Sequence, residues 1–320
     1  MSKKNRFVTV IINCFNGEEY IEQAIKSVIA QSYDNFELVI YDNKSTDRTR
    51  EIIKSFSDNR IKLFSAKRHV GLGQARNEAI RLSRGDFYAF LDSDDLWKSE
   101  KLKLQMKFFE DFEVGIVISN CIYKSEENER LSFRNPIKTD FHFKNLFLNY
   151  FITFSSVILR KSALDFKNPI FDESMTVCED PDLLLKITAR WKLACANKPL
   201  TIYRMHPESL TSKKPFLFVK ESGLAFHNLL NYLKNSNQDL FLWAKDNALK
   251  YSPLISSQMG IFYYYWKLKD RTNAIKSLNN THLSTHKKLL MSFVVFIDYK
   301  FFLKILRLRN SVINLFFCKC

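Results

Sequence analysis

The stretch Phe36-Glu-Leu-Val-Ile-Tyr41, which runs directly into Asp42-Asn-Lys-Ser-Thr-Asp47, decides the fold of this chain. A short apolar run followed by small polar side chains predicts a buried strand, and then a turn that starts a helix. The same pattern precedes this stretch. An apolar run over 7–12 is followed by residues 18–30, whose apolar side chains recur at helical spacing. A helix over 48–56 follows it, so strands and helices alternate along the chain.

The alternation continues with a strand over 61–65, a helix that opens at Gly71 and a strand over 86–91. Strands separated by helices predict βαβ crossovers and a mainly parallel sheet with helices on both faces. Ligands of such sheets bind beyond the carboxyl ends of the strands. Three predicted strands end in polar residues, namely Asn13 and Asn16, then Asp42, then Asp92, Asp94 and Asp95. The sequence therefore predicts a ligand site at this edge.

The composition separates two parts of the chain. With 46% hydrophobic and 26% charged residues, the chain is expected to fold around a core. Its net charge is +15, and most of the excess lies in residues 213–320, where long helical patterns replace the strand–turn rhythm. We therefore predict an α/β domain over 1–212 and a helical, basic region over 213–320. A basic region favours an anionic partner such as nucleic acid, acidic lipid or a phosphorylated substrate.

Three acidic residues suggest chemistry at the predicted edge. Asp92 and Asp94 offer hard oxygen ligands, which suit Mg²⁺ or Mn²⁺ shared with substrate phosphates. The alternative is that Asp94 or Asp95 caps a following helix. Asp42 can accept hydrogen bonds from a base or a ribose hydroxyl, or it can form a local turn with Asn43.

Three further positions carry two interpretations each. Arg76 can contact a nucleotide or diphosphate. Alternatively, it can pair with Glu18, Glu19 or an aspartate of the acidic turn, which is the turn that bears Asp92, Asp94 and Asp95. Asp180 follows Glu179 at a predicted helix start, where a carboxylate either complements the helix dipole or stays ionised as a general base. His206 follows a predicted strand and is either structural or a metal ligand.

Taken together, these pieces resemble the family 2 glycosyltransferases, which are inverting nucleotide-sugar transferases with the GT-A fold. The resemblance covers 1–212 and rests on six ordered segments: Val8–Asn16, Leu38–Asp47, Gly71–Asn77, Phe90–Asp95, Glu179-Asp180 and Tyr203–Ser209. It departs from the family at Asn13-Cys-Phe-Asn16, where Pro-x-Tyr-Asn is common, and at Asn43, where a second acid is common. The Gln-x-x-Arg-Trp motif of processive synthases is missing before Trp191, which favours transfer of one or a few sugars.

The resemblance implies a role for each site residue. Asn16, Asp42, Arg76 and Asp92 would bind the nucleotide, typically with uracil as its base, while Asp94 and His206 would hold Mn²⁺ or Mg²⁺. Asp180 would be the catalytic base that deprotonates the acceptor hydroxyl. The implied partners are a nucleotide-diphosphate sugar, typically a UDP-sugar, and a saccharide or lipid-linked acceptor at the cell surface.

Other readings stay open on the sequence alone. A nucleotidyltransferase would carry a Gly-rich basic loop after the first strand, which Asn13–Gly17 does not offer. A catalytically inactive membrane-bound scaffold could keep the same glycosyltransferase fold. In the tail, Lys300, Lys304 and Arg307 recur on one helical face and predict either contact with an anionic membrane or packing on the protein. We expect no nucleic-acid partner, because no recognised motif accompanies the charge.

The six cysteines show no CxxC spacing, which fits a reduced compartment. No apolar run reaches the ~18 residues that a membrane span requires. We therefore expect the protein in the cytoplasm, bound peripherally to the inner face of the cell membrane.

Overall fold

The computed structural model describes residues 6–166, 168–210, 215–247 and 275. The chain divides into two compact units. The first comprises Met1–His142 and Phe151–His206, and the second comprises Phe143–Tyr150 and Pro207–Cys320. The division predicted from the sequence, into 1–212 and 213–320, stays a prediction. The six residues of the candidate site from Asn16 to Asp180, together with His206, all lie in the first unit.

The first unit is built on one mixed sheet with the strand order β3-β2-β1-β4-β8-β6-β9-β5, and β7 pairs with β6 at the side. The strands β1, β2, β3 and β4 are mutually parallel, as the sequence predicts. β8 runs antiparallel to both β4 and β6, whereas β9 runs parallel to β6. The strand bounds are β1 Val8–Cys14, β2 Phe36–Asp42, β3 Ile61–Ser65, β4 Phe87–Phe90, β5 Leu96–Trp97, β6 Val114–Lys124, β7 Glu129–Leu131, β8 Ile158–Arg160 and β9 Lys192–Arg204.

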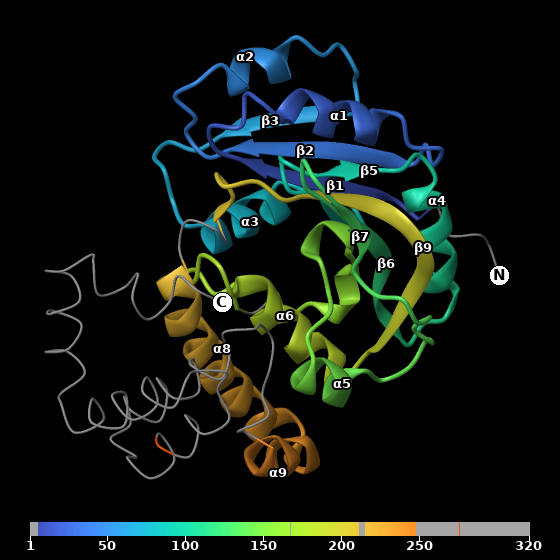
Figure 1. The fold of residues 1–320 in the computed structure, drawn as a ribbon, viewed down its shortest axis with the longest axis vertical. Coiled ribbons are helices and arrows are strands. Elements are labelled where there is room, and N and C mark those ends of the chain that lie inside the picture. The colour runs from blue at the N-terminus through green and yellow to red at the C-terminus, as the bar shows by residue number, and fades with distance from the viewer. Residues whose placement is uncertain (1–5, 167, 211–214, 248–274, 276–320) are drawn as a thin grey trace, which may run out of the picture. The chain divides into compact units, whose positions relative to one another are not determined.

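Helices cover both faces of the parallel half of the sheet. The helices α1 (Ile21–Ile29) and α2 (Thr49–Lys54) lie on one side of β1–β3, and α3 (Leu72–Arg81) lies on the other (Figure 1). This arrangement explains why β2 is buried at every position and is apolar at most of them. The predicted sheet with helices on both faces is confirmed. The remaining helices of the unit are α4 (Lys101–Gln105) and α6 (Glu179–Thr188), with short 3₁₀ turns at Met106–Glu110, Phe154–Ser156 and Lys161–Ala163.

The second unit is helical in its described part. It contains α5 (Phe143–Leu148), α8 (Pro215–Ser236) and α9 (Gln238–Asp246). The ring of Phe147 lies 6.3 Å from that of Phe226 and 5.2 Å from that of Trp243, so one aromatic side chain joins the three helices. The Asn237 side chain accepts a hydrogen bond from the Leu240 backbone N–H and caps α9.

The membrane prediction for the tail concerns Lys300, Lys304 and Arg307, which lie outside the described residues. In the part of the chain that the structure does describe, no helix has the length and hydropathy needed to cross a bilayer.

Two local expectations are wrong. Asp95 does not cap a helix, because the short strand β5 follows it and α4 begins only at Lys101. The apolar run over 151–159 predicts a strand from the sequence alone, but the structure has a 3₁₀ turn at Phe154–Ser156 followed by the three residues of β8. In both places, partners distant in the sequence determine the backbone. β5 forms because it pairs with β9, and β8 forms because β4 and β6 lie on either side of it.

A buried lysine in this unit leads to a stability prediction. The Lys101 side chain is fully buried, its Nζ lies 4.0 Å from the centre of the Trp97 ring, and no described residue accepts a hydrogen bond from Nζ. Burial lowers its pKa well below the usual value, so folding is expected to be less favourable as pH falls from about 10.

Lys101→Met should raise the free energy of unfolding by about 1 kcal/mol. Relief of an unsatisfied buried donor contributes about 1–3 kcal/mol, and loss of the contact with the ring costs about 0.5–1 kcal/mol. Denaturant unfolding measures the change, with the exposed Lys103→Met as the control from the same helix. A lower unfolding free energy for Lys101→Met would contradict the prediction.

Candidate active site

The ends of β1 and β2 form the first part of the site. Asn16 has a positive φ of 50°, a conformation that asparagine tolerates. Its Oδ1 accepts a hydrogen bond of 2.8 Å from the Thr46 backbone N–H, and its own N–H donates to Ser45 Oγ at 3.0 Å. Asn16 therefore fixes the turn that follows Asp42. The carboxylate of Asp42 accepts the Ser45 N–H at 3.0 Å and is 2% exposed.

Asn43, which stands where many family members carry an acid, has a structural role. Its Nδ2 donates to the Val70 carbonyl at 2.8 Å, and its Oδ1 accepts the Val70 N–H at 3.0 Å. An ionised aspartate could not donate the first of these bonds. These two hydrogen bonds hold the loop before α3, where the His69 ring lies 4.2 Å from the ring of Phe15. Sequence reasoning assigned no role to either ring, because the two are far apart in the chain.

The acidic turn after β4 is held by groups from two other segments. The Asp92 N–H donates to Ser155 Oγ at 3.1 Å, and the Ser155 hydroxyl donates to Asp95 Oδ2 at 2.5 Å. Asp95 Oδ1 also accepts the Arg204 backbone N–H at 3.0 Å. The pKa of Asp95 is raised by burial and by its neighbours Asp94 and Asp92. Asp95 therefore organises the turn instead of capping a helix.

Asp94 and His206 form the candidate metal pair. His206 Nε2 lies 3.0 Å from Asp94 Oδ2, and the two side chains are 15% and 30% exposed, respectively. Among the described residues, no cluster of three or more His, Cys, Asp or Glu side chains is placed to enclose a metal ion. One carboxylate and one imidazole nonetheless fit a Mg²⁺ or Mn²⁺ ion that takes its other ligands from water and a diphosphate.

Asp180 lies at the start of α6, where the sequence predicts it. Its side chain is partly exposed, unlike that of Glu179, which is 1% exposed. The pKa of Asp180 is raised to about 8 by burial in the site, and the neighbouring Glu179 and Asp92 carboxylates raise it further, whereas Arg76 lowers it. A carboxyl group with a pKa near the working pH has the proton affinity that a general base needs.

Arg76 lies on α3 and is 4% exposed. Its Nη1 lies 2.6 Å from Glu179 Oε1, and its Nη2 lies 3.1 Å from Asp92 Oδ1. The contact with Asp92 matches the alternative in which Arg76 pairs with an aspartate of the acidic turn. The contact with a nucleotide or diphosphate stays a prediction. The pairing with Glu179 spans 103 positions and was not predicted from the sequence.

The segment before α6 packs tightly on α3. A Cβ atom at Gly73 would lie 2.6 Å from the Asp172 carbonyl oxygen, so only glycine fits at this close approach. Asn77 completes the contact, because its Nδ2 donates to the Phe171 carbonyl at 2.9 Å and its Oδ1 accepts the Phe171 N–H at 2.9 Å. The Gly71–Asn77 motif thus positions the segment that leads to Asp180.

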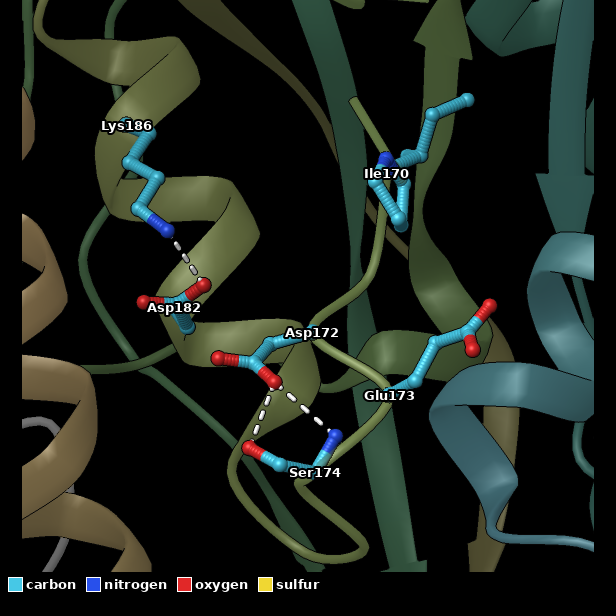
Figure 2. A pocket seen from close by; sticks show the side chains of 7 residues that line it. Ile170, Asp172, Glu173, Ser174, Asp182 and Lys186 are labelled. Carbon is cyan, nitrogen blue, oxygen red and sulfur yellow. Dashed lines mark hydrogen bonds and ion pairs between the residues drawn. The ribbon is translucent and has the colours of Figure 1, made fainter.

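A pocket of about 410 Å³ lies beside this segment. Figure 2 shows its polar wall, in which Lys186 pairs with Asp182 at 2.6 Å on α6 and Asp172 accepts two hydrogen bonds from Ser174. The pocket is lined by Pro169, Ile170, Asp172, Glu173, Ser174, Asp182 and Lys186. It is distinct in its lining from the candidate active site, because Asp180 and the acidic turn do not contribute to it.

The structure therefore gathers the predicted residues in two connected groups. Asn16 and Asp42 lie at the ends of β1 and β2, which are neighbours in the sheet. β4 pairs with the other side of β1 and brings in the acidic turn. The second group consists of Arg76, Asp92, Asp94, Asp180 and His206, which are connected by the ion pairs and charge interactions described above.

Comparison with known proteins identifies the family. The sequence model of "Glycosyl transferase family 2" matches residues 9–166. An Escherichia coli protein, the UDP-Glc:alpha-D-GlcNAc-diphosphoundecaprenol beta-1,3-glucosyltransferase WfgD, is 32% identical over 209 residues, which are 65% of this chain and 80% of that protein. The E. coli enzyme WfaP, of the same described activity, is 30% identical over 68% of this chain and 84% of its own length.

Solved structures agree on the fold. The crystal structure of S. aureus TarS 1-349 in complex with UDP-GlcNAc has a TM-score of 0.60 at 17% identity and covers 86% of this chain and 84% of TarS 1-349. The mannosyltransferase PcManGT from Pyrobaculum calidifontis, in complex with GDP-Man and Mn²⁺, has a TM-score of 0.56 at 16% identity and covers 96% of this chain and 86% of its own. With the sheet, the ordered motifs and these relatives in agreement, the chain belongs to glycosyl transferase family 2 and is a glycosyltransferase that uses nucleotide sugars.

Proposed function

We propose that this glycosyltransferase moves a sugar, with inversion, from a UDP-sugar to a hydroxyl of a saccharide or lipid-linked acceptor, with the help of a divalent metal ion. The observation that carries the proposal is the placement of Asp180 in one charge network with the acidic turn that bears Asp92 and Asp94. A base for the acceptor and carboxylates for the donor are thus available within one site.

Each residue has a defined task in this mechanism. Asp180 accepts the proton of the acceptor hydroxyl, whose oxygen forms a bond to the anomeric carbon from the face opposite the diphosphate. The bond from that carbon to the diphosphate oxygen breaks, and UDP leaves with the electron pair. Asp42 and Asp92 hold the nucleoside. Asp94 and His206 would hold Mn²⁺ or Mg²⁺, which neutralises charge on the diphosphate.

The UDP donor and the lipid-linked acceptor are supported by the relatives. The described activity of WfgD and WfaP names UDP-Glc as donor and a diphosphoundecaprenol-linked sugar as acceptor. We extend this donor class to the chain because residues 9–166, which the family model matches, include the turn after Asp42 and the acidic turn. Asn43 does not weaken the proposal, because its side chain is committed to Val70.

The donor proposal predicts a metal-dependent rise in thermal stability. A nucleotide at 100 times its Kd stabilises a native protein by about 2.7 kcal/mol. For a chain of this size, that corresponds to a rise in Tm of about 4 °C. The panel consists of UDP, GDP, CDP and dTDP, each with Mn²⁺, Mg²⁺ or EDTA. We expect the largest rise with UDP and a metal ion, whereas no rise with any pair would overturn the proposal.

We also propose that the protein works in the cytoplasm at the inner face of the cell membrane. The support is the lipid-linked acceptor of the relatives and the excess positive charge of residues 213–320. Cosedimentation of the full chain with vesicles tests this. We expect binding to vesicles that contain anionic phospholipid and little binding to neutral ones, and equal recovery from both would contradict it.

A further inference from the structure

Arg76 joins two elements that carry different parts of the proposed reaction. Its guanidinium contacts Asp92 through Nη2 and Glu179, at the start of α6, through Nη1. Asp92 lies in the acidic turn after β4, which is called the donor turn below because the proposed function assigns it to the donor. The two carboxylates come from segments 87 positions apart in the chain, and Arg76 itself comes from a third element, α3. A single side chain therefore connects the donor turn to the helix that begins beside Asp180.

The surroundings of Arg76 make this connection strong. The guanidinium carbon lies 4.1 Å from the centre of the Phe154 ring and 5.5 Å from that of Phe171. With 4% exposure, the guanidinium has aromatic faces where water would otherwise lie. Charges interact more strongly where water is excluded, and removal of one partner leaves the others uncompensated.

We infer that Arg76 is a positioning residue for the general base, which holds the first turn of α6 against the donor turn and balances the negative charge around Asp180. The inference rests on the proposed function, because it assumes that Asp180 is the base. It assigns Arg76 a task different from the contact with the nucleotide that the family resemblance implies.

The charged groups that face Asp180 come from three elements. Glu179 lies beside it on α6, Asp92 faces it from the turn after β4, and Arg76 faces it from α3. Two of them are carboxylates, and they raise the pKa of Asp180, whereas the single cation lowers it. Arg76 is thus the group that opposes both carboxylates.

The inference predicts opposite effects for two substitutions. Arg76→Met leaves both carboxylates unopposed, so Asp180 should lose its proton only at higher pH. The acid limb of the pH profile, where kcat/KM falls as the base becomes protonated, should therefore shift to higher pH by roughly one unit. Glu179→Gln removes a neighbouring negative charge, so the acid limb should move down. A residue that merely supports the fold would not move the two profiles in opposite directions.

The experiment compares full-length variants by the release of UDP from UDP-Glc, with α-D-GlcNAc-diphosphoundecaprenol as the acceptor, between about pH 6 and about pH 10. We expect Arg76→Met to lower kcat at pH 7 by about tenfold with less than about a threefold change in the donor KM. Arg76→Lys keeps the charge and should restore much of the original profile. If Arg76→Met does not fold, Arg76→Lys and Glu179→Gln still test the inference.

Arg160 provides the matched control. Its guanidinium also lies over aromatic rings, those of Phe87, Phe109 and Phe112, and it donates to backbone carbonyls, but it contacts no residue of the site. Arg160→Lys should change Tm while leaving the acid limb in place.

The outcomes separate the inference from the function on which it rests. If Asp180→Asn retains turnover, the base assignment fails. If Asp180→Asn is inactive but Arg76→Met and Glu179→Gln leave the acid limb unmoved, or move it in the same direction, the inference alone fails. A large rise in donor KM for Arg76→Met with an unchanged acid limb would make Arg76 a donor-binding residue and would also overturn the inference.

Discussion

Asp180→Asn should lower kcat by about 10²–10⁴-fold, because an amide cannot accept the proton of the acceptor hydroxyl. The substitution preserves the shape of the side chain, so its effect is chemical. Donor affinity should change little, since the proposed nucleotide and metal contacts come from Asp42, Asp92, Asp94 and His206. The expected signature is therefore a loss in kcat with little change in the donor KM.

Two measurements check this expectation. Release of UDP from UDP-Glc gives kcat, and calorimetric titration with UDP and Mn²⁺ gives donor affinity. Asp182→Asn is the matched control, because Asp182 lies on the same helix and pairs with Lys186 at its second turn. This control should lower stability and keep turnover. An Asp180→Asn enzyme with more than about a tenth of the original kcat would refute the base assignment.

The same residue determines the pH dependence of the native enzyme. With its pKa raised to about 8, Asp180 is mostly protonated below that pH, so kcat/KM should rise as pH increases toward the pKa. Stability should change in the opposite sense. Between the unfolded value near 4 and about 8, the folded state binds the extra proton, and the stabilisation that this proton supplies is lost as pH rises.

The parts of this fold that could be predicted from the sequence are those that local residues determine. The strand β2 is apolar at most positions because both its faces are buried, and Asp42 is its last residue, at the carboxyl end of the strand. The acidic turn after β4 and the start of α6 are local in the same sense. Consequently the positions of Asp42, Asp92, Asp94 and Asp180 could be predicted from short windows of sequence.

Contacts between distant segments could not be predicted in this way. Asp95 reads locally as a cap, but it is bound by Ser155 and by the backbone of Arg204, 60 and 109 positions away. Arg76 reads as a cation for phosphate, but its two partners come from the turn after β4 and from the start of α6. For both residues, the tertiary arrangement decides which of several chemically reasonable partners is present.

The amide at position 43 shows how a departure from a family pattern can be resolved by geometry. In the sequence, Asn43 in place of an acid weakens the prediction that the nucleotide is UDP. In the structure, the amide donates to and accepts from the same residue, Val70, a pairing that an ionised acid could not complete. Asp42 alone is then left to supply the carboxylate at the end of β2.

Asp94→Asn should weaken metal-dependent binding of UDP by about 100-fold, which is the second large effect that the structure predicts. The substitution removes the carboxylate charge from the pair with His206, and a hard divalent cation depends on that charge more than on the imidazole. UDP binding in EDTA should be nearly the same in the variant and the native protein, because the contacts from Asp42 and Asp92 remain.

Calorimetric titration with UDP in Mn²⁺ and in EDTA measures both quantities, and titration with Mn²⁺ alone reports the ion without relying on turnover. Asp111→Asn is the matched control, since Asp111 is an exposed acid that pairs with Lys192 outside the site. Equal Mn²⁺-dependent affinity in the Asp94→Asn and native proteins would remove Asp94 from the metal site. The combination of lost metal dependence with preserved UDP binding in EDTA would place the ion on the diphosphate, where it can assist the departure of UDP while Asp180 accepts the proton of the acceptor.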